Sequence, residues 1–124
     1  ISQVKVLGLE NVAYLDKVNG GVRKTQKGAV IITEEVDRIY TDVPSELIID
    51  DAALGRRIHI SSVGSKTAIV WNPWGESCKK MADLKDDDYK RFVCVETANA
   101  AADVVKVSPG SESRLLARYR VERR

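Results

Sequence analysis

The strongest constraint on the fold is a two-residue alternation of apolar and polar side chains, which recurs in short segments along most of the chain. In residues 56–61, with the sequence RRIHIS, Ile58 and Ile60 alternate with polar residues. Successive side chains of a β-strand point to opposite faces of a sheet, so this period predicts strands with one buried face. His59 falls on the polar side of the pattern, and we expect it to be solvated. Similar segments occur at residues 3–9, 28–33, 38–43, 45–50, 66–71, 91–96, 103–108 and 113–121.

Turn residues separate these segments at intervals of about a dozen residues, including Gly20, Gly55, Gly64 and Pro109–Gly110. This spacing favours an antiparallel β-sandwich or barrel over alternating strands and helices. We therefore predict an all-β, antiparallel β-sandwich that forms a single domain over residues 1–124. One long connection, residues 72–91, lacks the alternation, and within it residues 76–84 are expected to form a short helix of about two turns.

The composition excludes several classes of protein. The chain has 44% hydrophobic and 31% charged residues with a net charge of +2, which argues against a nucleic-acid partner. It has no apolar stretch of about 20 residues, so we expect no membrane span. Cys78 and Cys94 lack the spacing of a zinc site or a disulfide framework, which predicts a reducing compartment such as the cytoplasm. The acidic cluster of Asp83, Asp86, Asp87 and Asp88 lacks the glycine and terminal glutamate of a calcium loop, and no metal site is expected.

Glu96 is the carboxylate most suggestive of chemistry, because it directly follows the apolar run of residues 92–95. Alternation puts it on the same face as Phe92 and Cys94. If that face is packed, the carboxylate is partly desolvated and its pKa rises toward the range of a general base. If the strand has already ended, Glu96 is simply solvated.

A second candidate group lies in the sequence IVWNPWGES, where Trp71 and Asn72 end a strand. A tryptophan can stack on a sugar ring while a neighbouring amide binds a hydroxyl group. The alternative is that Trp71 and Trp74 only pack the following connection onto the core.

The segments EEVDRIYTDVP, IVWNPWGESCKKMADLKDDDYKRFVCVE and VSPGSES resemble the glucose-6-phosphate 1-epimerases, which are hexose-6-phosphate mutarotases of the aldose 1-epimerase superfamily. The resemblance implies a β-sandwich of the galactose-mutarotase type, without a cofactor, that interconverts the α and β anomers of a hexose 6-phosphate. It implies that Glu96 is the general base and that Asp37 contributes to the sugar site. Trp71 and Asn72 would border the pocket.

The resemblance also implies that the acid, a histidine, and the arginines that bind phosphate precede the first residue of this chain. His59 does not match the motif of that histidine. The chain would then correspond to the C-terminal half of such an enzyme, with uncovered strand edges that can associate with other chain segments. Two alternatives are a non-catalytic carbohydrate-binding or interaction module and a purely structural β domain. The resemblance fits either the cytoplasm or a plastid.

Overall fold

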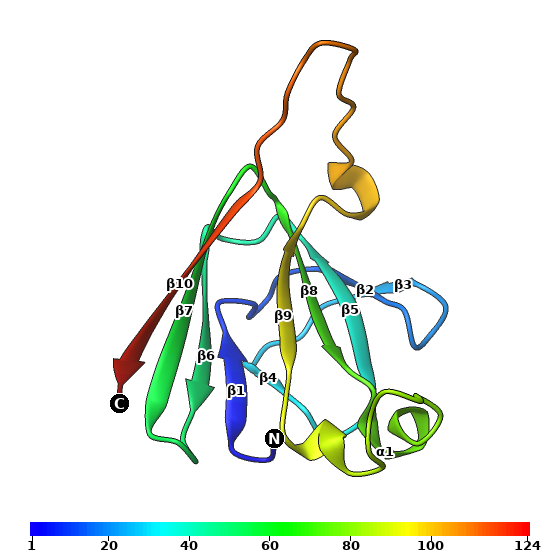
Figure 1. Cartoon of the computed structure of the whole chain (residues 1–124), viewed down its shortest axis with the longest axis vertical. Helices are drawn as coiled ribbons and strands as arrows, with labels where there is room; N and C mark the ends of the chain where they lie inside the picture. The colour runs from blue at the N-terminus through cyan, green and yellow to red at the C-terminus, as the bar shows by residue number, and fades with distance from the viewer.

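The computed structural model describes residues 1–124 and consists of two five-stranded antiparallel sheets (Figure 1). The predicted antiparallel β-sandwich is thus confirmed. The first sheet, called the β7 sheet, has the order β10 (Leu116–Arg123), β7 (Arg56–Val63), β6 (Glu46–Asp51), β1 (Val4–Leu7) and β4 (Val30–Ile31). The second, called the β8 sheet, has the order β3 (Val22–Lys24), β2 (Tyr14–Asp16), β5 (Val36–Thr41), β8 (Thr67–Asn72) and β9 (Cys94–Ala98).

The hydrophobic core lies between the two sheets and is built mainly from β-branched and aromatic residues. On β5, Val36 and Tyr40 point inward and are almost completely buried, while Asp37 and Ile39 alternate with them. The same rule holds on β8, where Val70 is fully buried. The alternation read from the sequence is therefore the physical basis of the core. The core cluster comprises Val6, Leu9, Tyr14, Val30, Ile32, Val36, Tyr40, Leu47, Ile60, Ala68, Val70 and Val95.

The long connection between β8 and β9 contains little helix. Helix α1 spans only Trp74–Cys78, and a single 3-10 turn spans Asp88–Lys90. The expected helix over residues 76–84 is wrong in length, because after Cys78 the chain continues in separate turns. The Cys78 thiol contacts the carbonyl oxygen of Lys85 at 3.2 Å, which folds the connection back on itself.

The segment 103–108 is also not a strand, although its sequence alternates. It includes part of the 3-10 turn Ala101–Asp103 and otherwise runs without regular structure through the excursion at the top of Figure 1. Val104 and Val107 are exposed there. A strand forms only when a neighbouring strand supplies hydrogen-bond partners, and none lies beside this segment.

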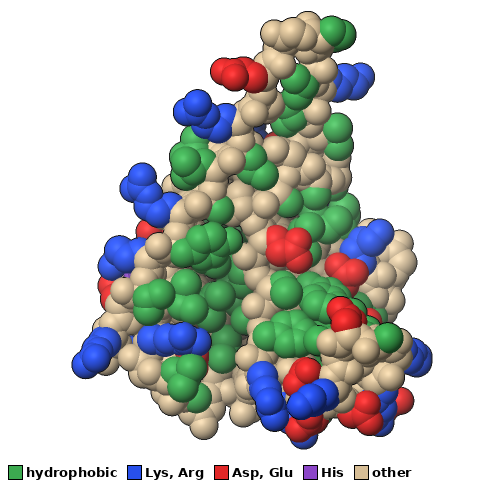
Figure 2. All heavy atoms as spheres, in the orientation of Figure 1, with side chains coloured by type: hydrophobic (Ala, Val, Ile, Leu, Met, Phe, Trp, Pro, Cys, Tyr) green, Lys and Arg blue, Asp and Glu red, His purple; other side chains and the backbone are tan.

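One side of the sandwich is uncovered. Tyr119 and Val121 on β10 pair with Ile60 and Ile58 of β7, so they share the inward face, yet they are 59% and 62% exposed. Figure 2 shows hydrophobic side chains at the surface on the side that carries β10 and β7. In the second sheet, β9 is an edge strand, with no strand paired to its outer side. The expectation of uncovered strand edges therefore matches this side of the molecule.

None of the helices has the length and apolar character that crossing a lipid bilayer would require.

Candidate functional site

Three of the four residues expected at the site lie on the outward face of the β8 sheet. Asp37 pairs with Trp71, and Trp71 pairs with Cys94, so these residues form one row across β5, β8 and β9. Ile69 pairs with Glu96 in the next row of outward-facing residues. Side chains of directly paired residues project from the same face. The register thus brings Asp37, Trp71 and Glu96 together on one surface.

Glu96 is exposed in this chain, and the expectation of a partly desolvated carboxylate is not met here. The strand does not end before it, since β9 continues to Ala98. The reason is that the packed face of β9 carries Val95, whereas Glu96 projects from the opposite face. Because β9 is also an edge strand, no neighbour shields Glu96 from that side.

Asp37 and Glu96 differ from the other carboxylates on strands because their side chains have no hydrogen-bond or ion-pair partner within the chain. The other five strand carboxylates all have one. A carboxylate without an internal partner keeps its acceptor oxygens free for a ligand. The partnered carboxylates are Asp16 with Lys24, Glu46 with Ser61, Asp50 with Arg57, Asp51 with Arg56, and Glu122 with Arg120.

Aromatic and sulfur groups lie on this face in the row next to Glu96 and beyond it. The rings of Trp71 and Phe92 lie 5.7 Å apart between centroids at a tilt of 35°, which gives a partly exposed apolar wall. Cys94 lies between Phe92 and Glu96 along the chain and is half-buried. Burial raises the pKa of the Cys94 thiol, and the charge of Glu96 raises it further. The alternation of residues 92–96 was the sequence signal that could have identified Phe92 and Cys94 as part of this surface.

Asn72 does not join this surface. Its side chain is fully buried, donates hydrogen bonds to the carbonyl oxygens of Tyr89 and Phe92 at 2.9 Å each, and accepts one from the backbone N–H of Trp74 at 2.9 Å. The two donated bonds join the two ends of the connection between β8 and β9, and the accepted bond fixes the first turn of the connection. Asn72 therefore acts on the candidate site only by positioning Phe92.

His59 is buried rather than solvated, so the expectation from the sequence is wrong. It is only 8% exposed, and its ring nitrogens lie 3.4 Å from a carboxylate oxygen of Glu46 and 3.2 Å from one of Glu122. These residues belong to the strands on either side of β7, and their side chains cover the imidazole. His59 lies in the β7 sheet, not in the sheet that carries Glu96, which separates it from the candidate site.

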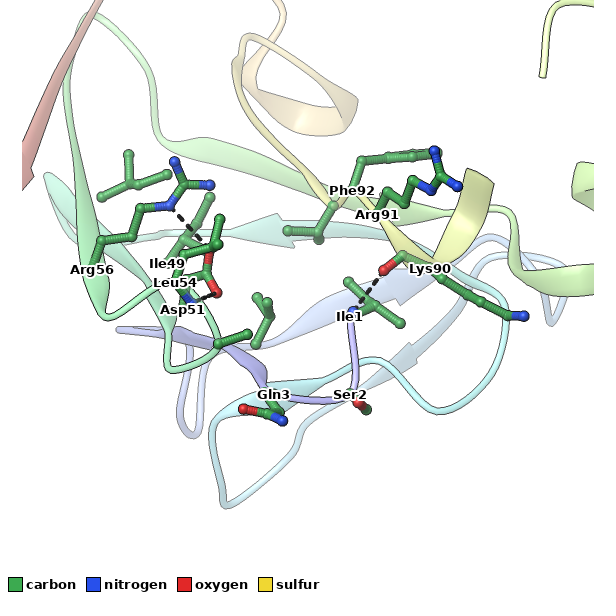
Figure 3. Close-up of a pocket in the computed structure, with 14 residues that line it drawn as sticks. Ile1, Ser2, Gln3, Ile49, Asp51, Leu54, Arg56, Lys90, Arg91 and Phe92 are labelled. Carbon is green, nitrogen blue, oxygen red and sulfur yellow. Dashed lines mark hydrogen bonds and ion pairs between the residues drawn. The ribbon is translucent and has the colours of Figure 1, made fainter. Parts of the chain in front are cut away.

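A cavity of about 380 Å³ lies elsewhere, on the open side of the sandwich (Figure 3). The backbone nitrogen of Ile1 donates a hydrogen bond to the carbonyl oxygen of Lys90 at 2.7 Å, and Arg56 pairs with Asp51 at 3.0 Å. Phe92 is the one residue shared with the surface around Glu96. None of the four expected site residues lines this cavity.

Comparison with known proteins decides the family. A family model described as "Aldose 1-epimerase" matches residues 1–120. The chain belongs to the aldose 1-epimerase family. A relative from Cenchrus ciliaris, 38% identical over 115 residues and 92% of this chain, is named "Putative glucose-6-phosphate 1-epimerase". A relative from Escherichia coli with the same name is 34% identical over the whole chain.

Solved structures agree with this aldose 1-epimerase assignment. A crystal structure from Salmonella typhimurium, described as that of "a putative mutarotase", superposes on 99% of the chain with a TM-score of 0.85 and 32% identity. The chain spans only 35% and 42% of the length of the Cenchrus and Escherichia relatives, and 41% of the Salmonella protein. In those proteins, more than half of the polypeptide lies outside the matched region. Two parts of this aldose 1-epimerase fold are open to additional strands. One is the free edge of β9, and the other is the uncovered inward face of β10.

Proposed function

We propose that this chain carries the part of a hexose-6-phosphate mutarotase site that contains the general base, Glu96. Asp37 binds the sugar hydroxyls, and Trp71 packs against the sugar ring. The observation that supports this proposal most directly is the pair of strand carboxylates without partners, Asp37 and Glu96, on one face of the sheet. Membership of the aldose 1-epimerase family and the names of the relatives supply the reaction and the substrate class.

The proposed reaction needs one base and one acid. Glu96 takes the proton of the anomeric hydroxyl group, the bond between the anomeric carbon and the ring oxygen breaks, and the ring oxygen receives a proton from an acid. The aldehyde then rotates about the bond between carbons 1 and 2, and the reverse steps close the ring on its other face. No protons or electrons are lost over the cycle. A positioned base of this kind contributes about 10²–10⁴-fold to the rate.

The acid is not provided by the residues around Glu96. His59 lies in the opposite sheet, and the thiol of Cys94, with its raised pKa, is the only other titratable group next to Glu96 along the outward face of β9. We therefore place the acid on a segment that adds to the free edge of β9, where it would also cover Glu96. Such a covering segment would supply the desolvation that Glu96 lacks in this chain.

Measuring anomer exchange of glucose 6-phosphate by NMR tests the proposal. The intact protein that contains this chain is compared with Glu96→Gln, which keeps the shape of the side chain and removes its basicity. We expect the enzyme-dependent exchange to fall by about 10²-fold or more. Glu112→Gln, an exposed change in the excursion before β10, is the matched control and should exchange at the original rate. Equal exchange in Glu96→Gln and the control would remove Glu96 from the mechanism.

The exposure of Glu96 favours one second candidate, a carbohydrate-binding module that does not catalyse. An exposed carboxylate accepts hydrogen bonds from sugar hydroxyls whether or not a reaction follows. This candidate predicts saturable binding of glucose 6-phosphate with no exchange above the spontaneous rate, in both the original protein and Glu96→Gln.

A further inference from the structure

His59 of β7 lies between two carboxylates that come from the strands on either side of it. Its Nδ1 atom is 3.4 Å from Oε1 of Glu46 on β6, and its Nε2 atom is 3.2 Å from Oε1 of Glu122 on β10. The imidazole is buried, and it is the single histidine of the chain. One titratable side chain therefore connects three neighbouring strands.

Strand β10 depends on this contact more than an inner strand would. It is an edge strand, and the apolar side chains on its inward side are largely exposed (Figure 1). Its backbone pairs with β7 along its whole length. Beyond that pairing, the side chains of β10 make one polar contact with the rest of the protein, that of Glu122 with His59. Arg124, directly after the strand, adds an ion pair with Asp50 at 3.3 Å.

The protonation state of the imidazole decides whether it attracts both carboxylates. An ionised carboxylate only accepts hydrogen bonds, so the contact of Nδ1 with Glu46 needs a proton on Nδ1. In the neutral ring, Nε2 then presents a lone pair to the carboxylate of Glu122. Nε2 is closed to solvent and is not aligned for a hydrogen bond, so its contact with Glu122 is electrostatic. That contact is favourable only when the ring carries a positive charge.

The other charges around His59 are largely balanced. Arg120 pairs with His59 in the register of β10 and β7, but its guanidinium group binds Oε2 of Glu122 at 2.8 Å. Asp50 binds Arg57 at 3.1 Å. The two carboxylate oxygens that face His59 have no other partner. The charged groups on the outward sides of the three strands are Glu46, Asp50, Arg57, Arg118, Arg120 and Glu122, of which Arg118 alone makes no ion pair.

We propose that His59 is a pH-dependent clamp, which holds β10 against β7 and β6 when the imidazole is protonated and loosens β10 when the proton is lost. Histidine side chains ordinarily change charge between pH 5 and pH 8. The hydrogen bond from Arg120 and the contact with His59 lower the pKa of the Glu122 carboxyl group, so its charge is present throughout this range. The clamp therefore acts at the acid end of the range and is lost as the pH rises. It does not depend on the proposed function, because Glu96 lies in the other sheet.

Hydrogen exchange of the backbone amides of the intact protein, measured by mass spectrometry at pH 5.5 and pH 8, tests the clamp. Protection factors correct for the intrinsic effect of pH on exchange. In β10 they should fall by roughly two- to fivefold from pH 5.5 to pH 8, the effect of losing one partly exposed ion pair. The amides of β5, in the opposite sheet, are the internal reference and should keep their protection.

Three variants assign the change to His59. His59→Gln keeps a donor group but cannot change its charge, so β10 should be equally protected at both pH values. Glu122→Gln keeps His59 and the shape of its partner but removes the negative charge, and it should abolish most of the difference. Glu112→Gln, an exposed change in the excursion before β10, is the matched control and should keep the full difference. The NMR signal of His59, identified by its absence from His59→Gln, should titrate over the pH range in which β10 loses protection.

Each result supports or overturns the clamp. It is wrong if β10 of the original protein is equally protected at both pH values. A loss of protection that persists in His59→Gln or in Glu122→Gln would assign the effect to another group. A loss in β5 as large as that in β10 would mean that pH acts on the whole fold. If urea denaturation shows that His59→Gln does not fold, Glu122→Gln decides, since the side chain of Glu122 is 38% exposed and its replacement should leave the fold intact.

Discussion

Asn72 at the end of β8 holds the carbonyl oxygen of Phe92 at 2.9 Å and thereby fixes the chain where it enters β9. The two residues are 20 positions apart, and the connection between them contains only one short helix and one 3-10 turn. Because Phe92 contacts Trp71, the same bond sets the aromatic wall beside Glu96. A fully buried amide thus links the fold of the connection to the geometry of the candidate site.

Replacing Asn72 with alanine should destabilise the protein strongly. The change removes two donated hydrogen bonds and one accepted bond, and it leaves two carbonyl groups and the N–H of Trp74 without partners. We expect the free energy of unfolding to fall by about 2–4 kcal/mol, measured by urea denaturation. Asn72→Asp should be at least as damaging, since a carboxylate would face two carbonyl oxygens.

An exposed amide provides the comparison for Asn72. Gln3→Ala should change the free energy of unfolding by no more than about 0.5 kcal/mol, because Gln3 is exposed and its side chain makes no hydrogen bond. A loss below about 1 kcal/mol for Asn72→Ala would mean that the connection is not held by this amide.

Gly64 lies in the turn between β7 and β8, and Gly20, between β2 and β3, is a matched control for it. Both adopt positive φ, +79° and +69°, a conformation that costs a residue with a Cβ atom about 1–2 kcal/mol. A Cβ atom at Gly64 would also collide with the carbonyl oxygen of Arg114, whereas one at Gly20 would meet no atom within 4 Å. Gly64→Ala should therefore lower the free energy of unfolding by about 3 kcal/mol or more, and Gly20→Ala by about 1 kcal/mol. If urea denaturation gives the same loss of unfolding free energy for both variants, the segment leading into β10 moves aside to admit the new Cβ atom.

The acid stability of the protein should depend on Asp16. Burial of this residue raises its pKa, but the hydrogen bonds from Lys24 and Asn19, both at 2.7 Å, outweigh burial and hold the pKa below the ordinary 3.8. A lowered pKa means that the ionised carboxylate stabilises the fold above pH 3.8 and that this contribution is lost as the pH falls below that value.

Urea midpoints measured from pH 6 to pH 2 check this expectation for Asp16. Asp16→Asn cannot ionise, so its midpoint should fall less steeply on the acid side than that of the original protein. At pH 6 it should already be less stable by on the order of 1–2 kcal/mol, since the ion pair with Lys24 is gone. If the urea midpoints of the two proteins fall equally steeply toward pH 2, other carboxylates cause the loss of stability in acid.

How far the sequence predicts this structure depends on whether a feature is local. The alternation in residues 56–61 correctly predicts a strand, whereas only Cys94–Glu96 of the segment 91–96 lie in one, and there it correctly puts Cys94 and Glu96 on one side. Alternation does not say which side the second sheet will cover. Val95 faces the core, and Glu96 is consequently exposed.

Two features that depend on distant partners were predicted wrongly. His59 is buried because Glu46, 13 residues before it, and Glu122 on β10 cover its ring. Residues 103–108 have the pattern of a strand but lie beside no strand with which they can pair. The sequence shows which residues alternate, but the tertiary fold decides which other strand or side chain covers them.

The reactivity of Cys94 offers a direct probe of its distance from Glu96. Burial and the charge of Glu96 raise the pKa of this thiol above the ordinary 9.0, so little of it is the reactive thiolate at pH 8. Glu96→Gln removes the charge, lowers the pKa and should increase the rate of reaction with a thiol reagent by roughly two- to threefold at low salt. The increase should shrink in 1 M salt, which screens charges beyond about 3 Å.

Cys78 is fully buried and should contribute no fast phase, which Cys94→Ser verifies by abolishing the signal. A rate that is the same in Glu96→Gln, in the exposed control Glu112→Gln and in the original protein would mean that Glu96 turns away from Cys94. The carboxylate would then also turn away from the surface on which we place the sugar.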